Sequence, residues 1–443
     1  MGRARFSVTS LDTSNTGIRG VLGYWDDSEG DWVRGKAGEG AVVILDLAGA
    51  QDFGGEDNIL VLNPGVIVLG PGVAELTLGC RLYCVGDGHN RPTRICGVTF
   101  DANGQAVLPV ALDDTGVTGA LYKFVATDFQ GVDCRFTNSD PATTNEGNNF
   151  SIVADTDKGA DLDCRLERCQ MDNAYADCCS LKTIGTKDAG QNRITLVDCD
   201  MHTPGSGATD QALTGHERWR VIVRGGRYAC NTAGSGHQAI GSAAGCYVDV
   251  EGAFVAGKLV QVNRVVGCVL RSTRDADDFS DTAIVAEPNC WIQGNWLFGA
   301  CGNHTSDFYI ALDRTVGDAR RVDVVRDNVI LGNGNGTGIF ADDGGDGYKG
   351  TLLVLNNLIV GVQRGVYSAA TDAEHLYDLV AGNVIDASQY SILGTAGVTA
   401  TRLNLVSAPP STISLDATDE QRTIAKAELR QRLAGFATQR MGV

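Results

Sequence analysis

Two aspartates and a histidine occupy every second position of one short segment: Asp198, Asp200 and His202. In an extended strand, such positions project their side chains from one face. Basic residues recur in a similar way in the segment that follows: Arg218, Arg220 and Arg224. Two carboxylates beside a row of guanidinium groups could bind a uronic acid, with one carboxylate removing a proton while arginine neutralises the sugar's acid group. We therefore take Asp198, Asp200, His202 and Arg220 as candidate catalytic residues.

The same residues also have a purely structural interpretation. Acidic and basic rows on neighbouring strands can pair with one another across a solvated sheet face. Both interpretations stay open at this point, because alternating charges alone do not distinguish a binding site from a charged surface.

Three cysteines, Cys134, Cys169 and Cys199, stand at corresponding places in successive segments. They could form a reactive or metal-binding cluster, or they could be small buried residues, since a free thiol packs like a small apolar group. The paired spacing of a zinc site is missing around Cys178-Cys179, and Cys80 with Cys84 has no second half. We therefore favour packing, and we expect no metal and no cofactor.

Two further groups carry a weaker chemical signal. The acidic, glycine-rich run from Asp342 to Gly347 could bind calcium, but the twelfth position from Asp342 is Leu353, where an EF-hand needs glutamate. A plain acidic turn is the favoured interpretation. The tryptophans could form a strip that stacks on sugar rings, or they could pack against the coils: Trp219, Trp291 and Trp296.

The strands and turns that must position these residues are predicted by a short sequence motif that occurs three times. A short apolar run, an asparagine and then two apolar residues recur around Asn328, Asn357 and Asn383, at spacings of 29 and 26 residues. A repeat of this length, made only of strand and turn signals, predicts a solenoid of stacked β coils.

The asparagine position continues through the chain as a column of small or locally bonding residues, as a tight turn between two strands requires. The predicted members are Gly97, Cys134, Cys169, Cys199, Gly226, Gly252, Ser272, Asn295, Asn328, Asn357, Asn383 and Asn404. Most of them are followed two residues later by a large apolar side chain. Within this column we expect a structural ladder formed by Cys134, Cys169, Cys199, Asn295, Asn328, Asn357 and Asn383.

These residues resemble the right-handed parallel β-helix superfamily, which includes pectate-lyase-like enzymes and phage tailspikes. The resemblance extends from about Ile59 to Ser407. It implies an all-β, single-stranded, right-handed parallel β-helix whose asparagines stack inside one turn, in coils about 4.8 Å apart. Each amide would then bond to the same position above and below, for about 0.5–1.5 kcal/mol per bond.

The superfamily includes lyases, hydrolases, epimerases and binding proteins, so the fold does not select an activity. Polygalacturonase-like enzymes usually carry Asn-Thr-Asp and Gly-His-Gly motifs together with Asp-Asp. The chain contains Asp-Asp pairs, but it has no Asn-Thr-Asp, and its Gly-His pairs lack the following glycine. This departure argues against a galacturonase.

The sequence pattern divides the chain into three predicted parts. Residues 1–58, rich in aromatic and acidic residues, form a capping or docking segment; residues 59–408 form the solenoid; and residues 409–443 form a linker and a helix. The helix is predicted from Asp419 to Phe436, with one apolar stripe formed by Ala425, Leu429, Leu433 and Phe436. It would either cover the last coil or pack against a neighbouring chain.

The composition of the chain limits the classes of binding partner and the cellular compartments that we expect. A net charge of −18 argues against nucleic acid and against an anionic membrane. Fourteen cysteines in 443 residues are too few to signal a disulfide scaffold. The N-terminal residues lack the apolar core of a signal peptide, and no apolar run is long enough to span a membrane. We expect synthesis in a reducing cytoplasm, with free thiols.

We therefore expect a phage-like virion structural protein, such as a β-helical spike, fibre or capsid-decorating subunit, located in the virion. Resemblance to tailspikes implies a homotrimer in contact with other virion proteins, with a surface polysaccharide as a further partner. The alternative is a carbohydrate-active enzyme, a polysaccharide lyase or glycoside hydrolase, with its site between Asp198 and Arg224. A third possibility is a β-helix that serves as an adhesion scaffold.

Overall fold

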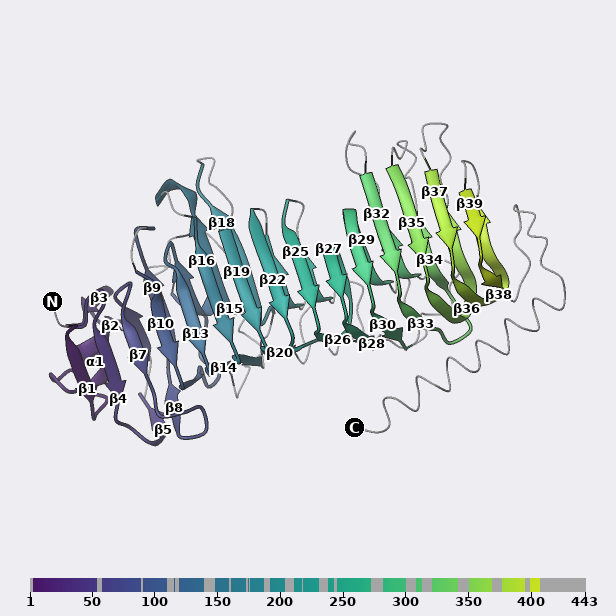
Figure 1. Cartoon of the computed structure of the whole chain (residues 1–443). Helices are drawn as coiled ribbons and strands as arrows, with labels where there is room; N and C mark the ends of the chain where they lie inside the picture. Colours follow the sequence, from purple (N-terminus) through teal and green to yellow (C-terminus); the bar gives the residue numbers. More distant parts are fainter. Residues whose placement is uncertain are drawn as a thin grey trace. The chain divides into compact units, whose positions relative to one another are not determined.

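The structure is a computed structural model that describes residues 3–53, 58–88, 91–109, 115, 119–138, 148–158, 161–172, 174, 176–186, 192–203, 211–216, 218–230, 238–242, 245–271, 282–299, 308–312, 321–341, 350–368, 377–394 and 399–406. The chain forms two compact units, Met1–Ala256 and Gly257–Val443. In each unit, short strands follow one another in chain order (Figure 1).

In the first unit, three strands complete one coil, so each strand apart from β2 (Gly23–Asp26) and β3 (Asp31–Arg34) pairs in parallel with the strand three places further along. For example, β13 (Phe129–Val132) pairs with β10 (Thr93–Cys96) and with β16 (Asp163–Glu167). The coils therefore stack into three parallel sheets. Sheet 1 also contains β1 (Arg5–Val8), β4 (Val42–Leu45), β7 (Ile67–Leu69), β19 (Asn192–Val197), β22 (Trp219–Arg224) and β25 (Tyr247–Glu251).

Sheets 2 and 3 of the first unit are built in the same way. Sheet 2 consists of β5 (Gly49–Asp52), β8 (Leu76–Gly79), β11 (Thr99–Asp101), β14 (Arg135–Thr137), β17 (Gln170–Asp172), β20 (Asp200–Thr203), β23 (Arg227–Cys230) and β26 (Phe254–Ala256). Sheet 3 consists of β6 (Ile59–Leu62), β9 (Arg81–Val85), β12 (Ala120–Val125), β15 (Asn148–Asp155), β18 (Cys179–Ile184), β21 (Gln211–Gly215) and β24 (Gln238–Ser242). A 3-10 turn, η1 (Thr156–Lys158), follows β15.

The second unit by itself also consists of three sheets, numbered in the same way, but some of its strands bend from one sheet into the next. Two of them run through sheets 3 and 1, namely β27 (Leu259–Val266) and β29 (Thr282–Gln293), and two run through sheets 2 and 3, namely β36 (Leu358–Ser368) and β38 (Val384–Gly394). The shorter strands are β28 (Val269–Arg271), β30 (Trp296–Phe298), β31 (Phe308–Leu312), β32 (Arg321–Arg326), β33 (Val329–Leu331), β34 (Thr337–Ala341), β35 (Gly350–Leu355), β37 (Tyr377–Ala381), β39 (Thr399–Arg402) and β40 (Leu405–Val406).

This architecture confirms the predicted all-β parallel β-helix, whose crossover connections are right-handed in nearly all proteins. Parallel pairing also extends into the predicted capping segment, because β1 pairs with β4 and β4 pairs with β7. The predicted C-terminal helix lies outside the described residues. Among the described residues, no helix has the length and apolar character needed to cross a membrane.

The N-terminal segment contributes a helix and a hairpin. Helix α1 (Ile18–Leu22) leads into β2 (Gly23–Asp26), which pairs antiparallel with β3 (Asp31–Arg34) and, through Tyr24, with Leu60 of β6. Trp25 of this hairpin packs in a cluster with Val61 and Tyr83 on sheet 3. The hairpin therefore covers apolar surface at the start of the solenoid, as a cap does.

The turn between sheets 1 and 2 carries the predicted column. A left-handed residue precedes each column member in turns such as Asp133 (φ 50°), Arg168 (φ 50°) and Asp198 (φ 50°). The register corrects three predicted members: the residues that align with Cys134 or Asn295 are Val98, Ala253 and Cys268. Gly97 and Gly252 stand one place earlier, at the left-handed position (φ 67° and 68°), and Ser272 lies outside the described residues. Glycine is favoured at the left-handed position because it has no side chain to clash there, which places a small residue next to the column position.

With this register, the large apolar side chain falls two residues after every column member. In the first unit these side chains include Phe100, Phe136, Met171, Met201 and Tyr228, each 0–2% exposed. Phe100 and Phe136 stack with ring centroids 5.5 Å apart. The interior is thus a set of rows in which like side chains of successive coils lie against one another.

Candidate functional site

Sheet 2 of the first unit turns a polar surface outward. Phe136, Met171 and Met201 point into the coil and are fully buried, so their neighbours on either side point outward by strand alternation. These outward residues are Arg135, Gln170, Asp172, Asp200, His202 and Arg227, all half-buried or exposed. We call this set the sheet 2 polar patch.

The register fixes which of these residues are neighbours. Asp172 lies directly opposite His202, while Asp200 lies between Gln170 and Arg227. Asp172 and Asp200 are therefore diagonal neighbours, with Cα atoms about 8 Å apart from the strand spacing and rise. Two carboxylates, an imidazole and two guanidinium groups thus share one small area.

The oxygens of the Asp172 and Asp200 carboxylates differ in the hydrogen bonds that they accept. Arg135 donates from Nε and Nη2 to Asp172 Oδ2, at 3.1 and 2.8 Å. The other oxygen, Asp172 Oδ1, and also Asp200 Oδ1 are buried and accept no hydrogen bond from the described residues. A buried acceptor without a donor is costly. Each of the two carboxylates therefore has one oxygen whose hydrogen-bonding capacity the described residues do not use.

The sequence-predicted catalytic residues are only partly brought together. Asp200 and His202 belong to the patch, and Asp198 is the exposed left-handed turn residue just before it. Arg220, in contrast, lies on sheet 1, in register with Arg193 and Tyr247, with its guanidinium 5.1 Å from the Tyr247 ring centroid. The arginine in register with Asp200 is Arg227.

Sheet 1 carries acidic and basic residues that pair between adjacent coils, although they are not the pairs that the sequence predicted. Arg193 donates to both oxygens of Asp163 at 2.9 and 2.6 Å, and Arg224 is paired with Asp249 at 2.9 Å. These bases are already bound to acids on adjacent coils. Sheet 1 therefore matches the structural interpretation of alternating charges, whereas sheet 2 holds the incompletely bonded carboxylates.

Sequence reasoning missed Arg135, Asp172 and Arg227, although a signal for them was present. Each stands one or three positions after a column member: after Cys134, Cys169 and Gly226 respectively. Asp200 and His202 stand at the same offsets from Cys199. Because the column aligns the coils, collecting these offsets from successive coils would have assembled the patch.

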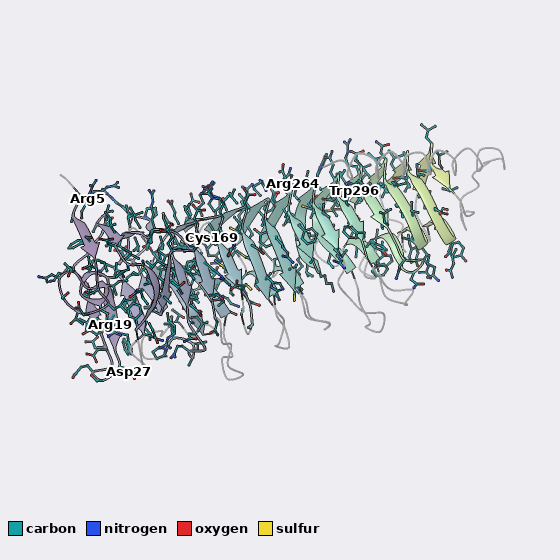
Figure 2. The ribbon with its side chains drawn as sticks, turned by 90° about the horizontal axis from the view of Figure 1, so that it is seen from below. Arg5, Arg19, Asp27, Cys169, Arg264 and Trp296 are labelled. Carbon is teal, nitrogen blue, oxygen red and sulfur yellow. The ribbon has the colours of Figure 1, made fainter. Side chains whose placement is uncertain are left out.

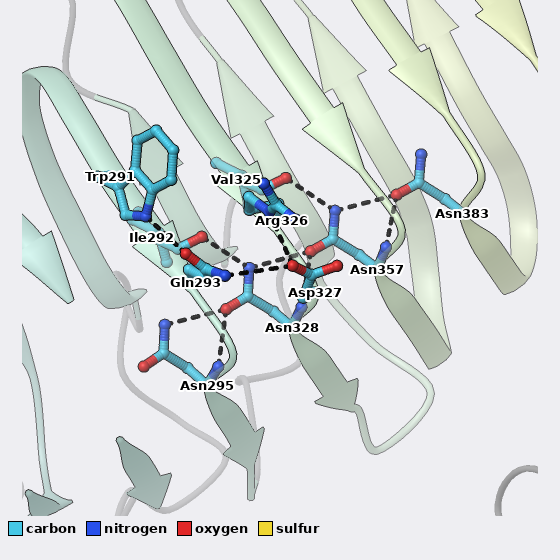
Figure 3. A network of polar contacts seen from close by, with 10 residues as sticks. All are labelled: Trp291, Ile292, Gln293, Asn295, Val325, Arg326, Asp327, Asn328, Asn357 and Asn383. Carbon is cyan, nitrogen blue, oxygen red and sulfur yellow. Dashed lines mark hydrogen bonds and ion pairs between the residues drawn. The ribbon is translucent and has the colours of Figure 1, made fainter. Parts of the chain in front are cut away.

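The asparagine ladder of the second unit is continuous. Nδ2 of Asn295 donates to Oδ1 of Asn328 at 2.9 Å, and Asn328 donates to Asn357 at 3.0 Å (Figure 3). The series continues through Asn383 to Asn404, again at 3.0 Å for each bond. Each acceptor oxygen also binds the backbone N–H of the preceding asparagine, as Asn357 does for Asn328 at 3.0 Å. These side chains are thus fully used in holding coils together.

The cysteine members of the column are packed inside the first unit. Cys134, Cys169 and Cys199 are buried, and each Sγ lies 3.3–3.5 Å from the carbonyl oxygen two residues before it (Cys169 is labelled in Figure 2). Burial raises the pKa of Cys199 to about 12, so its thiol is protonated. The described residues contain no group of three potential ligands placed to hold a metal.

The predicted strip of tryptophans does not form among the described residues. Trp219 is 1% exposed, and its indole N–H donates to the carbonyl oxygen of Lys182 at 2.9 Å. In the second unit, Trp291 lies on sheet 1 and Trp296 on sheet 2, so they form no common strip. The acidic run 342–347 lies outside the described residues.

Comparison with known proteins adds little to this geometry. No family model matches the chain, and no curated protein matches its sequence. Among solved structures, it is similar to the A-module of the mannuronan C-5 epimerase AlgE4 from Azotobacter vinelandii, with 13% identity, a TM-score of 0.32, and coverage of 84% of this chain and 87% of that one. The AlgE6 A-module from the same organism matches at 11% identity and a TM-score of 0.31, with 84% and 86% covered.

A third similar structure is the surface protein and adhesin PfbA from Streptococcus pneumoniae, with 11% identity, a TM-score of 0.30, and coverage of 84% of this chain and 91% of that one. Similarities of this degree do not carry an activity from one chain to another. The assignment of function therefore rests on the patch itself.

Proposed function

We propose that this protein binds an acidic polysaccharide across the sheet 2 polar patch and cleaves it, as a polysaccharide lyase or glycoside hydrolase does. The observation that carries the proposal is the pair of buried carboxylate oxygens, Asp172 Oδ1 and Asp200 Oδ1, which accept no hydrogen bond from the described residues. Proton transfer requires a carboxylate within hydrogen-bond reach of the reacting group.

The neighbouring cations explain the preference for an acidic sugar. Arg227 is exposed beside Asp200, and Arg135 flanks Asp172. A guanidinium group binds a carboxylate through two parallel hydrogen bonds. Arg227 would hold the uronate, Asp200 would act as the base, and His202 or Asp172 would supply the proton to the leaving oxygen. The net charge of −18 makes this local basic edge necessary for a polyanion to approach.

The test is a panel of uronate-containing and neutral polysaccharides. A lyase produces an unsaturated sugar that absorbs in the ultraviolet, and a hydrolase produces new reducing ends without that absorbance. Asp172→Asn and Asp200→Asn should each lower the rate about 10²- to 10⁴-fold. Asp163→Asn, which changes an exposed acid on sheet 1, is the matched control. Equal loss in the control, or full activity in both patch variants, would show that the patch is not the site.

We also propose that the protein works as a homotrimeric β-helical spike, fibre or capsid-decorating subunit of a virion, in which the patch would meet the polysaccharide of a host surface. The free cysteines among the described residues, nearly all of them buried, support folding under reducing conditions, as in a host cytoplasm. Mass photometry of the purified protein tests the trimer. A monomer that depolymerises a uronate polymer would overturn the virion proposal while leaving the enzymatic proposal intact.

A further inference from the structure

The first strand of sheet 1, β1, has a neighbouring strand on one side only. Among the described residues, the strand that pairs with it is β4. The N–H of Val42 in β4 donates to the carbonyl oxygen of Ala4 at 2.9 Å. Because alternate residues of a parallel strand bond to the same neighbour, the peptide groups of Arg5 and Ser7 face away from β4. We call this side of the strand the open edge of β1.

The open edge of β1 is accessible. Arg5 and Ser7 are exposed, and Arg5 lies at the N-terminal end of the first unit (Figure 2). Phe6, between them, is half-buried and in register with the buried Val43, so it points toward the interior. Outside the ladder, the described residues make no backbone hydrogen bond to Arg5 or Ser7. An unpaired strand edge is a template for pairing with another chain.

The side chains around the open edge are basic, although the chain as a whole is acidic. Arg5 begins an outward row of sheet 1 that continues through Val42 and Ile67 to Arg94. Arg3, just before β1, is exposed as well. No carboxylate in the part of the chain that the structure describes pairs with Arg3, Arg5 or Arg94. With a net charge of −18, such uncompensated arginines favour an acidic partner at this end.

A cavity of about 500 Å³ opens at the start of β1. It is lined by Arg3 and Ala4, by residues 38–41, and by Arg91. Arg91 Nε lies 3.8 Å from Glu39 Oε1, and the Arg91 side chain is 66% exposed, so this ion pair is loose. Two guanidinium groups therefore line one cavity that holds a single carboxylate. Since guanidinium groups bind carboxylates through charge-assisted hydrogen bonds, the cavity is suited to receive a second carboxylate.

We propose that β1 accepts an additional strand from an acidic, extended polypeptide segment of a partner protein. The segment's backbone bonds to the free peptide groups of Arg5 and Ser7. One of its acidic side chains stands opposite Arg5, and another enters the cavity between Arg3 and Arg91. The alternate side chains of the segment lie beside Phe6, so the recognised sequence alternates acidic and apolar residues. The inference is independent of the proposed function, because it involves no residue of the sheet 2 polar patch.

The first experiment measures fluorescence anisotropy of two labelled peptides with the full-length protein, one of alternating Glu and Val and one of alternating Lys and Val. The acidic peptide should bind with a Kd below about 1 mM and the basic one should not. Ser7→Pro removes an N–H at the open edge and leaves the bonds to β4 in place, so it should weaken binding at least about 10-fold. Arg5→Glu should reverse the preference between the two peptides.

Arg220→Glu is the matched control, because Arg220 is an exposed outward arginine of the same sheet in a strand that is paired on both sides. Its effect on affinity should be less than about 2-fold. Absence of binding by the acidic peptide, unchanged binding in Ser7→Pro, or an equal loss in Arg220→Glu would overturn the proposal.

Two further measurements test the kind of occupant. In the unchanged protein, saturating acidic peptide should slow hydrogen exchange across β1 at least about 10-fold, and slowing confined to other regions would contradict the proposal even if the variants fail to fold. A soluble uronate polymer that displaces the peptide and binds Ser7→Pro equally well would assign the arginines to a polysaccharide instead. An oligomer that dissociates when the peptide is added, as seen by mass photometry, would assign the open edge to a second copy of this chain.

Discussion

Arg135 binds one oxygen of Asp172 and leaves the other without a donor. The two hydrogen bonds to Oδ2, at 3.1 and 2.8 Å, cross from β14 to β17 and hold the carboxylate in one orientation. Oδ1 is buried beside the strand that carries His202. Arg135 is therefore a positioning residue for the polar patch, and this role can be separated from any role in stability.

Arg135→Gln should reduce activity or affinity toward the acidic polysaccharide by about 10- to 100-fold, because a carboxylate displaced by about 1 Å loses its alignment with the substrate. Thermal stability should change little, since the pair is partly exposed and such pairs contribute about 0–1 kcal/mol. Arg193→Gln is the control, because Arg193 makes a similar two-bond contact with Asp163 on sheet 1. A similar loss of activity in both variants would rule out a specific role for Arg135.

Asn357→Ala should destabilise the second unit by about 2–5 kcal/mol, because it leaves the buried N–H and Nδ2 of Asn328 without their acceptor. Denaturant unfolding followed by a probe in the second unit measures this loss. Asn333→Ala, at an exposed position, is the control and should change stability by less than about 0.5 kcal/mol. If the two variants behave alike, the ladder bonds contribute no more than ordinary surface contacts.

The buried thiols predict a loss of stability at alkaline pH. Burial raises the pKa of both Cys84 and Cys199 to about 12, above the value of about 8.5 expected in the unfolded chain. Between these values the unfolded thiol ionises and the folded one does not, so rising pH favours unfolding. Each such thiol should lower stability by about 1.4 kcal/mol per pH unit in this range.

Urea unfolding between pH 8 and pH 10.5, in the presence of a reductant, measures this slope. Cys199→Ala should have a shallower slope than the unchanged protein, by the contribution of one thiol. An unchanged slope would mean that Cys199 ionises as readily in the folded state as in the unfolded one.

The lowered pKa of His216 predicts a loss of stability at acid pH as well. Its Nε2 contacts Lys182 Nζ, and burial together with the nearby Lys182 charge lowers the pKa of His216 to about 4. The unfolded imidazole has a pKa of about 6.5. As pH falls from 6.5 to 4, the unfolded state takes up a proton that the folded state does not, so stability decreases.

Melting temperatures measured between pH 7.5 and pH 4 should therefore fall less steeply in His216→Gln than in the unchanged protein. His202→Gln is the matched control, because it removes a histidine of the polar patch and leaves the contact with Lys182 in place. An NMR titration that finds His216 protonated well above pH 5 in the folded protein would contradict the prediction.

The repeat was predictable from sequence because the residues that define it are close together in the chain. Apolar runs, glycines at left-handed turns and the asparagines at Asn328, Asn357 and Asn383 all reflect constraints within a single coil. The errors at Gly97 and Gly252 were also local, since the left-handed position and the column position are adjacent and both accept small residues. Only pairing between coils distinguishes them.

The sequence by itself therefore determined an all-β solenoid of parallel coils with buried thiols in its first part and an asparagine ladder in its second. The tertiary structure decided which outward side chains become neighbours: Asp172 faces His202, and Arg227 rather than Arg220 stands beside Asp200. The physical reason is that contacts between coils join residues about 30 positions apart across connections of unequal length. Their register is set by backbone hydrogen bonds and interior packing over the whole stack, which no short pattern of residues encodes.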